Sequence, residues 1–121
     1  MKKLVVSLVT LSILAVSAAL VRAADEPAAT TTVTGEVLDM ACYLDHGAHG
    51  EKHAGCAEKC ISSGLPVGIK NEADGKVYLV IGAHKPMNDQ LAAYAAKTVT
   101  LKGKAVTRDG INLLENAELV K

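Results

Sequence analysis

Residues 98–120 read TVTLKGKAVTRDGINLLENAELV, and this stretch carries the clearest structural signal of the chain. Apolar and small residues alternate with polar ones along residues 98–107, which is typical of a half-buried β-strand. The Arg108-Asp109-Gly110 sequence favours a tight turn, because Asp-Gly readily adopts positive φ angles. Residues 111–120 predict a second strand, and its inward pattern shifts after Leu113. We therefore expect an antiparallel hairpin with a β-bulge near Leu114–Glu115.

The sequence before this hairpin predicts three further strands and one helix. Residues 33–40, 67–70 and 77–81 are short, rich in β-branched residues and bounded by turn residues. Residues 87–96 predict a helix, since apolar residues recur there at helical spacing. This order, with a helix between the third and fourth strands, is that of the five-stranded OB barrel. We therefore predict a mainly β fold: a small five-stranded OB-like barrel, with an insert at residues 41–64 after its first strand.

Two local expectations accompany this assignment. Gly35 interrupts the first strand, where it predicts a bulge or a sharp bend. Asn88 or Lys85 is expected to cap the helix at residues 87–96. Its buried face is expected to consist of Met87, Leu91, Tyr94 and Ala95.

The insert concentrates almost all the soft metal donors of the chain. It holds all three cysteines and three of the four histidines, namely Cys42, His46, His49, His53, Cys56 and Cys60. Their spacing would place them on one face of a continuous helix. That helix, however, would hold Cys42 roughly 27 Å from Cys60, too far apart for one metal ion. Because glycines interrupt the segment, we expect a loop over residues 44–51 that returns Cys42 to the Cys56–Cys60 pair.

This arrangement predicts a Cys₃His metal site. The three thiolates would come from Cys42, Cys56 and Cys60. His53 is our first choice for the imidazole ligand because it lies three residues before Cys56. His49 and His46 are the next candidates. Thiolates and imidazole suit zinc or copper rather than calcium or magnesium, and Asp39 or Asp45 is expected to orient the ligating histidine.

Several short motifs in and around the insert resemble a known pattern. Asp39-x-x-Cys42-Tyr43, Cys56-x-x-x-Cys60 and Gly64-x-Pro66 are similar to a pattern of poorly characterised small secreted bacterial OB-fold-like proteins. The Gly103-Lys104-Ala105-Val106 sequence and the Arg108-Asp109-Gly110-Ile111 sequence after it resemble the closing hairpin of the same proteins. The resemblance covers about residues 33–120. It implies a fold and a site, and it brings no named activity.

Two alternatives to a metal site stay open from the sequence. Cysteines four apart in a helix have Cβ atoms about 5–6 Å apart, whereas a disulfide needs about 3.8 Å. A bridge would therefore join Cys42 to Cys56 or Cys60 and leave one free thiol. The protein would then be a metal-free binding module for a protein or glycan partner. The third alternative is a thiol redox protein; the sequence gives little support for an enzyme, since it contains no C-x-x-C motif.

Residues 1–23 predict a secretory signal peptide. Lys2 and Lys3 precede an apolar run at residues 4–20, and Val21-Arg22-Ala23 is suited to cleavage after Ala23. We expect a flexible leader at residues 24–32, a domain at residues 33–121, and an exported protein, either periplasmic or secreted. After cleavage no membrane segment is expected.

The composition of the expected mature chain bears on its partners. Removal of residues 1–23 leaves 10 basic and 13 acidic residues, and thus a net charge of −3. A mildly acidic domain without Phe or Trp is poorly suited to contact the phosphates or stack on the bases of nucleic acid. We therefore expect a metal ion, and in the alternative a protein or glycan, rather than nucleic acid.

Overall fold

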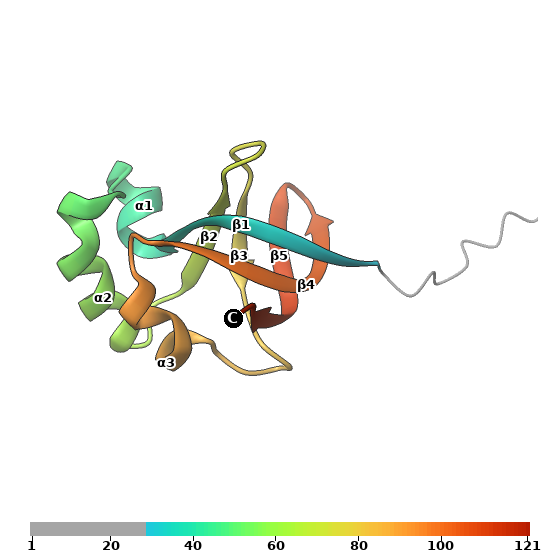
Figure 1. Cartoon of the computed structure of the whole chain (residues 1–121). Coiled ribbons are helices and arrows are strands. Elements are labelled where there is room, and N and C mark those ends of the chain that lie inside the picture. The colour runs from blue at the N-terminus through green and yellow to red at the C-terminus, as the bar shows by residue number, and fades with distance from the viewer. Residues whose placement is uncertain (1–28) are drawn as a thin grey trace, which may run out of the picture.

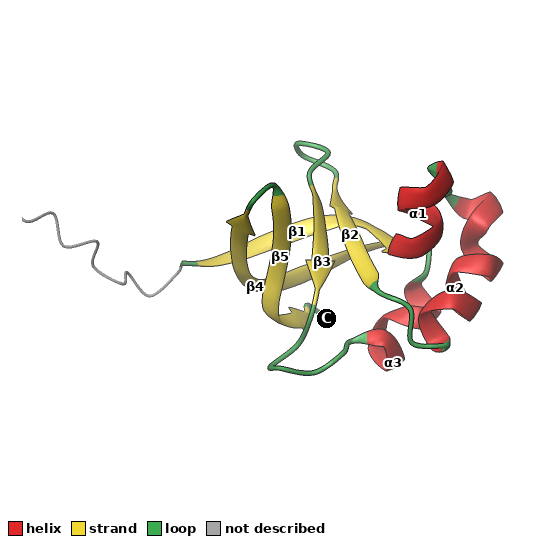
Figure 2. Cartoon of the chain, turned by 180° about the vertical axis from the view of Figure 1, so that it is seen from behind, coloured by secondary structure: helices red, strands yellow, loops and turns green. Residues whose placement is uncertain are grey.

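The computed structural model describes residues 29–121, which form a closed five-stranded barrel (Figures 1 and 2). Its strands are β1 (Thr30–Asp39), β2 (Val67–Asn71), β3 (Val77–Val80), β4 (Thr98–Arg108) and β5 (Ile111–Leu119). They follow one another around the barrel in the order β1-β2-β3-β5-β4, and β1 pairs with β4 to close it. Only the β3–β5 pair is parallel among these strands. The predicted OB-like barrel is confirmed.

The hairpin of β4 and β5 forms as expected, with its bulge slightly displaced. Asp109 and Gly110 both have positive φ angles, 51° and 82°, which fits a type I′ turn. The pairing then shifts so that β5 holds one extra residue between Glu115 and Glu118. Asn116, with φ of 51°, lies in this interval. The bulge therefore follows the predicted position by one to two residues, and it lets Leu114 and Ala117 both face the core.

The first strand differs from its prediction at two points. It begins at Thr30, so the last three residues of the predicted leader pair with β4. The predicted signal peptide and residues 24–28 of the predicted leader lie outside the described residues. The structure shows no bulge at Gly35, because the pairing with β2 and β4 continues there without a shift. Gly35 instead allows β1 to approach the Lys70 carbonyl of β2 closely.

The helices lie at one end of the barrel (Figures 1 and 2). The insert contains α1 (Met40–His46), a 3₁₀ turn η1 (Glu51–His53) and α2 (Ala54–Ser62). The connection from β3 to β4 contains α3 (Asn88–Leu91) and the 3₁₀ turn η2 (Ala92–Tyr94). The helix predicted at residues 87–96 thus splits into an α-helical and a 3₁₀ turn. Within residues 29–121, no helix is long and apolar enough to span a membrane.

Details of the α3 region also correct the sequence analysis. Met87 occupies the N-cap position of α3, and no side chain caps this helix end. The Asn88 side chain, one of the two expected caps, instead donates hydrogen bonds to the carbonyl oxygens of Ile61 and Leu65, at 2.8 and 2.7 Å. Tyr94 is 39% exposed rather than buried. The Asn88 side chain therefore fastens α3 to the end of α2.

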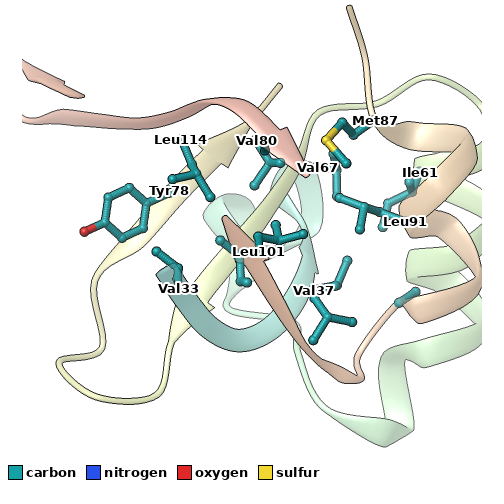
Figure 3. Packing of buried hydrophobic residues seen from close by; sticks show 14 of the residues in the cluster. Val33, Val37, Ile61, Val67, Tyr78, Val80, Met87, Leu91, Leu101 and Leu114 are labelled. Atoms are coloured by element: carbon teal, nitrogen blue, oxygen red, sulfur yellow. The ribbon is translucent and has the colours of Figure 1, made fainter. Parts of the chain in front are cut away.

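One apolar cluster extends through the barrel and under the helices (Figure 3). Ile61 of α2, Met87 and Leu91 lie together at its helical end in Figure 3, so α2 and α3 are held by the same core as the strands. The cluster consists of Val33, Val37, Ala57, Ile61, Val67, Ile69, Tyr78, Val80, Met87, Leu91, Ala95, Val99, Leu101, Leu114 and Ala117. This packing gives the insert a firm base on the barrel.

Candidate metal centre

The site begins where β1 passes directly into α1. Asp39 is the last residue of the strand and the N-cap of the helix, and its Oδ1 accepts a hydrogen bond from the Ala41 amide at 3.0 Å. The Met40 amide donates to the Pro66 carbonyl at 3.0 Å. The Asp39-x-x-Cys42 and Gly64-x-Pro66 motifs therefore meet in space. Cys42 lies in the first turn of α1, just beyond the barrel.

A short loop at residues 47–50 then reverses the chain. Gly47 ends α1 with φ of 71°, a conformation that favours glycine. The Glu36 carboxylate of β1 accepts a hydrogen bond from the Gly50 amide and lies 3.5 Å from Nδ1 of His49. The predicted return of the chain thus occurs through a shorter loop than residues 44–51, and it brings α2 alongside α1 (Figures 1 and 2).

The second helix presents two cysteines from successive turns. Cys56 and Cys60 are separated by one turn of α2, while Ala57 and Ile61 are buried in the core. Gly64, with φ of 98°, lets the chain leave the helix, and the Leu65 amide donates to the Cys60 carbonyl at 3.1 Å. Core packing on one side therefore leaves both thiols free to face α1.

These elements bring five donor groups together. One ring nitrogen of His53 and the Sγ atoms of Cys42 and Cys56 all lie within 4.8 Å of one another. A carboxylate oxygen of Asp39 and the Sγ atoms of Cys42 and Cys60 form a second such group. Cys42 belongs to both groups and joins them into one cluster, which we call the donor cluster (Asp39, Cys42, His53, Cys56 and Cys60).

Asp39 and His53 face each other inside this cluster. Oδ2 of Asp39 lies 3.6 Å from Nε2 of His53, too far for a hydrogen bond. The two side chains are 0% and 15% exposed. Within residues 29–121, neither atom has a hydrogen-bond partner. Two buried polar atoms without partners are costly in a folded protein, so this pair requires an explanation.

The carboxylate and the thiols influence one another's ionisation. The Asp39 carboxylate beside it, together with burial, raises the pKa of Cys42 to about 12. The pKa of Cys60 is also raised, chiefly by burial and then by Asp39. Burial works to raise the pKa of Asp39, but polar contacts with the Cys42 thiol and the Ala41 amide outweigh it, and the pKa is lowered. The thiols of Cys42 and Cys60 lower the pKa of Asp39 without a hydrogen bond to its Oδ2. Without a bound cation, the cluster therefore holds an ionised carboxylate beside the protonated thiols of Cys42 and Cys60.

The other candidate residues of the insert lie apart from the donor cluster. His46 pairs with Asp45 at 3.1 Å on the surface, where both side chains are largely exposed. Asp45 therefore contacts a histidine that lies outside the donor cluster. His49 lies beside Glu36 and packs edge-on against Tyr43, with ring centroids 6.2 Å apart. Neither His46 nor His49 belongs to the two donor groups.

Sequence reasoning assigned Asp39 only an orienting part. One signal could have placed Asp39 in the cluster: it directly follows the apolar residues Val37 and Leu38 at the end of a predicted strand. A buried aspartate in such a position is almost always paired with another group. Asp39 is indeed the one buried charged residue of the described chain. Helix capping accounts for one of its oxygens and leaves the other to the cluster.

A separate apolar cavity of about 520 Å³ lies near the end of α2. Its walls include Pro66, Val67, Leu79, Ile81 and Leu113, and no member of the donor cluster lines it. His84 and Lys85 lie at this cavity and are exposed.

Fold and site together define a small OB-like barrel that carries a Cys/His/Asp donor group at the end of its first strand. Comparisons with known protein families, with curated proteins and with solved structures found no match.

Proposed function

We propose that this protein binds one transition-metal ion, zinc or copper, through Cys42, His53, Cys56 and Cys60. The proposal depends above all on the grouping of Cys42, His53 and Cys56, whose ligand atoms lie within 4.8 Å of one another. Two donors of one tetrahedral zinc ion lie about 3.3–3.8 Å apart, given bonds of about 2.0–2.3 Å. Side-chain movements of an ångström or less would therefore bring these three donors to one ion, and Cys60 of the second donor group would be the fourth ligand.

The donor types favour a soft or borderline ion. Thiolate and imidazole bind zinc and copper well and bind calcium and magnesium poorly. The ligands also come from elements on two sides of the site, α1 on one side and the η1–α2 segment on the other. A bound cation would further neutralise the ionised Asp39 carboxylate, which lies 0% exposed beside the thiols.

Among structural, carrier and sensing roles, we favour carriage or sensing. Cys56 is exposed, and Cys42 and Cys60 are half-buried, so an incoming ligand could reach the ion. The insert also has an anchor of its own, because Ile61 and Ala57 are buried in the barrel core. Metal exchange would therefore not require the fold to open.

We further propose that the mature protein begins after Ala23 and is exported, so that it acts in the periplasm or outside the cell. The support is the charged, then apolar, then small-residue order of residues 1–23. The intact mass of protein recovered from that compartment tests it. A mass that includes residues 1–23 would contradict this part of the proposal.

The decisive test of binding is elemental analysis of protein purified without chelator from the compartment it is exported to. About one zinc or copper ion per chain is expected, together with three thiols that become reactive after chelation. His53→Ala should lose the metal, whereas His84→Ala should retain it, because His84 lies in an exposed loop outside the donor cluster. Equal retention in both variants would remove His53 from the ligand set.

The same measurements separate the alternatives. A protein without metal, with one reactive thiol under denaturing conditions, would be a disulfide-stapled binding module for a protein or glycan. Cys42 would be one partner of that bridge, since its Sγ lies within 4.8 Å of those of both Cys56 and Cys60. The intact mass distinguishes the disulfide-bonded protein from the reduced one, because a disulfide lowers the mass by about 2 Da.

A further inference from the structure

We infer that Oδ2 of Asp39 is a direct metal ligand, and that this oxygen makes the site select zinc(II) over copper(I). The inference rests on the proposed metal binding and names the ion that the site takes. The sequence analysis expected Asp39 only to orient a ligating histidine. In that role the carboxylate would hold the imidazole ring without contacting the ion.

The first argument is the separate use of the two carboxylate oxygens. Oδ1 accepts the hydrogen bond from the Ala41 amide and caps α1. Oδ2 has no partner among residues 29–121, although the side chain is 0% exposed. The cap also fixes the carboxylate at the end of β1, so Oδ2 cannot turn to solvent without loss of the helix cap. A buried carboxylate oxygen without a partner is costly, and a bound cation would satisfy it.

The second argument is the nitrogen that faces this oxygen. A carboxylate that orients a ligating histidine hydrogen-bonds the ring nitrogen that points away from the metal. Here Oδ2 lies 3.6 Å from Nε2 of His53, and Nε2 is likewise buried and without a partner among the described side chains. Two ligands of one tetrahedral ion have about this separation. Nitrogen and oxygen therefore converge on one ion instead of binding each other.

The third argument is the position of the thiols around this pair. Asp39 shares its donor group with Cys42 and Cys60, and His53 shares its donor group with Cys42 and Cys56. A tetrahedral ion bound by Cys42 has three further positions, which the oxygen, the nitrogen and one of the two other sulfurs would fill. Cys56 is the most exposed of the three thiols, so it is the donor that another ligand can most easily replace.

Metal selectivity follows from this mixed set of donors. Zinc(II) is borderline-soft and binds Cys, His and carboxylate ligands alike. Copper(I) is selected by thiolates and thioethers, and a hard carboxylate oxygen adds little to its binding. A doubly charged ion also offsets more of the negative charge of the thiolates and Asp39. The carboxylate therefore strengthens zinc binding more than copper(I) binding.

Asp39→Asn tests the inference in the reduced full-length mature protein. Asparagine is as good an N-cap as aspartate, so α1 keeps its cap while the anionic oxygen is removed. Asp39→Ser, which also caps helices, is a second variant in case the first folds poorly. Asp45→Asn is the matched control, since Asp45 lies on the surface nearby and pairs with His46.

Zinc and copper(I) affinities are measured for each variant by competition with a chelator specific for each ion. We expect Asp39→Asn to lose zinc affinity by about 100-fold or more, beyond the 10–100-fold typical of residues that merely orient ligands. Copper(I) affinity should change less than about threefold. The visible absorption of bound cobalt(II), which reports on the ligand set, should change in Asp39→Asn and stay unchanged in Asp45→Asn.

Three outcomes would overturn the inference. Zinc affinity and a cobalt(II) spectrum unchanged by Asp39→Asn would show that Oδ2 is not a ligand. Equal losses for zinc and copper(I) would remove the selectivity. A wild-type protein that prefers copper(I) to zinc would contradict it as well. By contrast, wild-type protein that binds neither ion would refute the proposed function itself, and the two failures are thus distinct.

Discussion

Replacement of Gly35 by alanine tests how closely the first two strands of the barrel approach each other. Gly35 is buried in β1 and pairs with Asn71 on one side and Val99 on the other. A Cβ atom at this position would lie 1.8 Å from the carbonyl oxygen of Lys70 and 2.6 Å from its carbonyl carbon. Because both are backbone atoms of β2, no side-chain rotation relieves the contact. The two strands would have to move apart.

The expected cost follows from this geometry. An extra methyl group in a well-packed interior costs about 1–3 kcal/mol when side chains can adjust. Here the separation also weakens adjacent hydrogen bonds of the ladder, each of which contributes about 1 kcal/mol. We therefore expect Gly35→Ala to lower the free energy of unfolding by about 4 kcal/mol, a large share of the 5–15 kcal/mol typical of a domain. For a domain of this size the melting temperature falls by roughly 15–30 °C.

Gly55→Ala is the matched control, because the same atom is added with the opposite result. Gly55 lies in α2, and a Cβ atom there meets nothing within 4 Å. Alanine has the higher helix propensity, so the free energy of unfolding should rise by about 0.5–1 kcal/mol.

Urea and thermal unfolding followed by circular dichroism would measure both variants, with chelator and reductant present so that metal binding does not contribute. Gly35→Ala within 1 kcal/mol of the wild type would refute the close approach of β1 and β2. Destabilisation of similar size in both variants would refute the assignment of Gly55 to an uncrowded helix position.

Two further predictions concern the site and its support. Zinc binding should release close to two protons from Cys42 and Cys60 at pH 7, because the pKa of Cys42 is raised to about 12 by the Asp39 carboxylate and that of Cys60 by burial. The apparent zinc affinity of the reduced protein, measured by chelator competition, should therefore rise at least about 100-fold per pH unit between about pH 6 and 8, and a tenfold rise or less would contradict the ligand set. Asn88→Ala should lower the free energy of unfolding by about 1–3 kcal/mol, because it removes hydrogen bonds of 2.8 and 2.7 Å to two carbonyl groups at the end of α2. Gln90→Ala, at an exposed position of the same helix, should change stability little, and equal effects of the two variants would contradict this account.

Much of the barrel could be predicted because its signals are local. Alternation of apolar and polar residues along residues 98–107 and the Asp109–Gly110 turn depend only on neighbours in the chain. The bulge in β5 was predictable for the same reason, since its inward pattern changes phase. The exact position of the bulge was not predictable, because the pairing with β4 and the burial of Ala117 place it at Asn116.

Gly35 and Asn88 illustrate where such local reasoning ends. Their neighbours in sequence suggest a bulge and a helix cap, which are the commonest uses of these residues in such contexts. In the folded protein Gly35 makes room for the Lys70 carbonyl, and Asn88 binds the carbonyl groups of Ile61 and Leu65. Those partners belong to other elements, and only packing brings them within reach.

The candidate site divides in the same way. The sequence alone determined that Cys42 must return toward Cys56 and Cys60 if they are to share an ion, because the rise of a helix keeps distant turns apart. Tertiary structure alone decided that His53, and not His46 or His49, joins the thiols, and that Asp39 stands among them. The reason is physical: the rotation of α2 is set by the burial of Ala57 and Ile61, and the place of Asp39 is set by the end of β1. Spacing in a sequence shows which donors can meet, whereas packing of the elements that hold them determines which ones do.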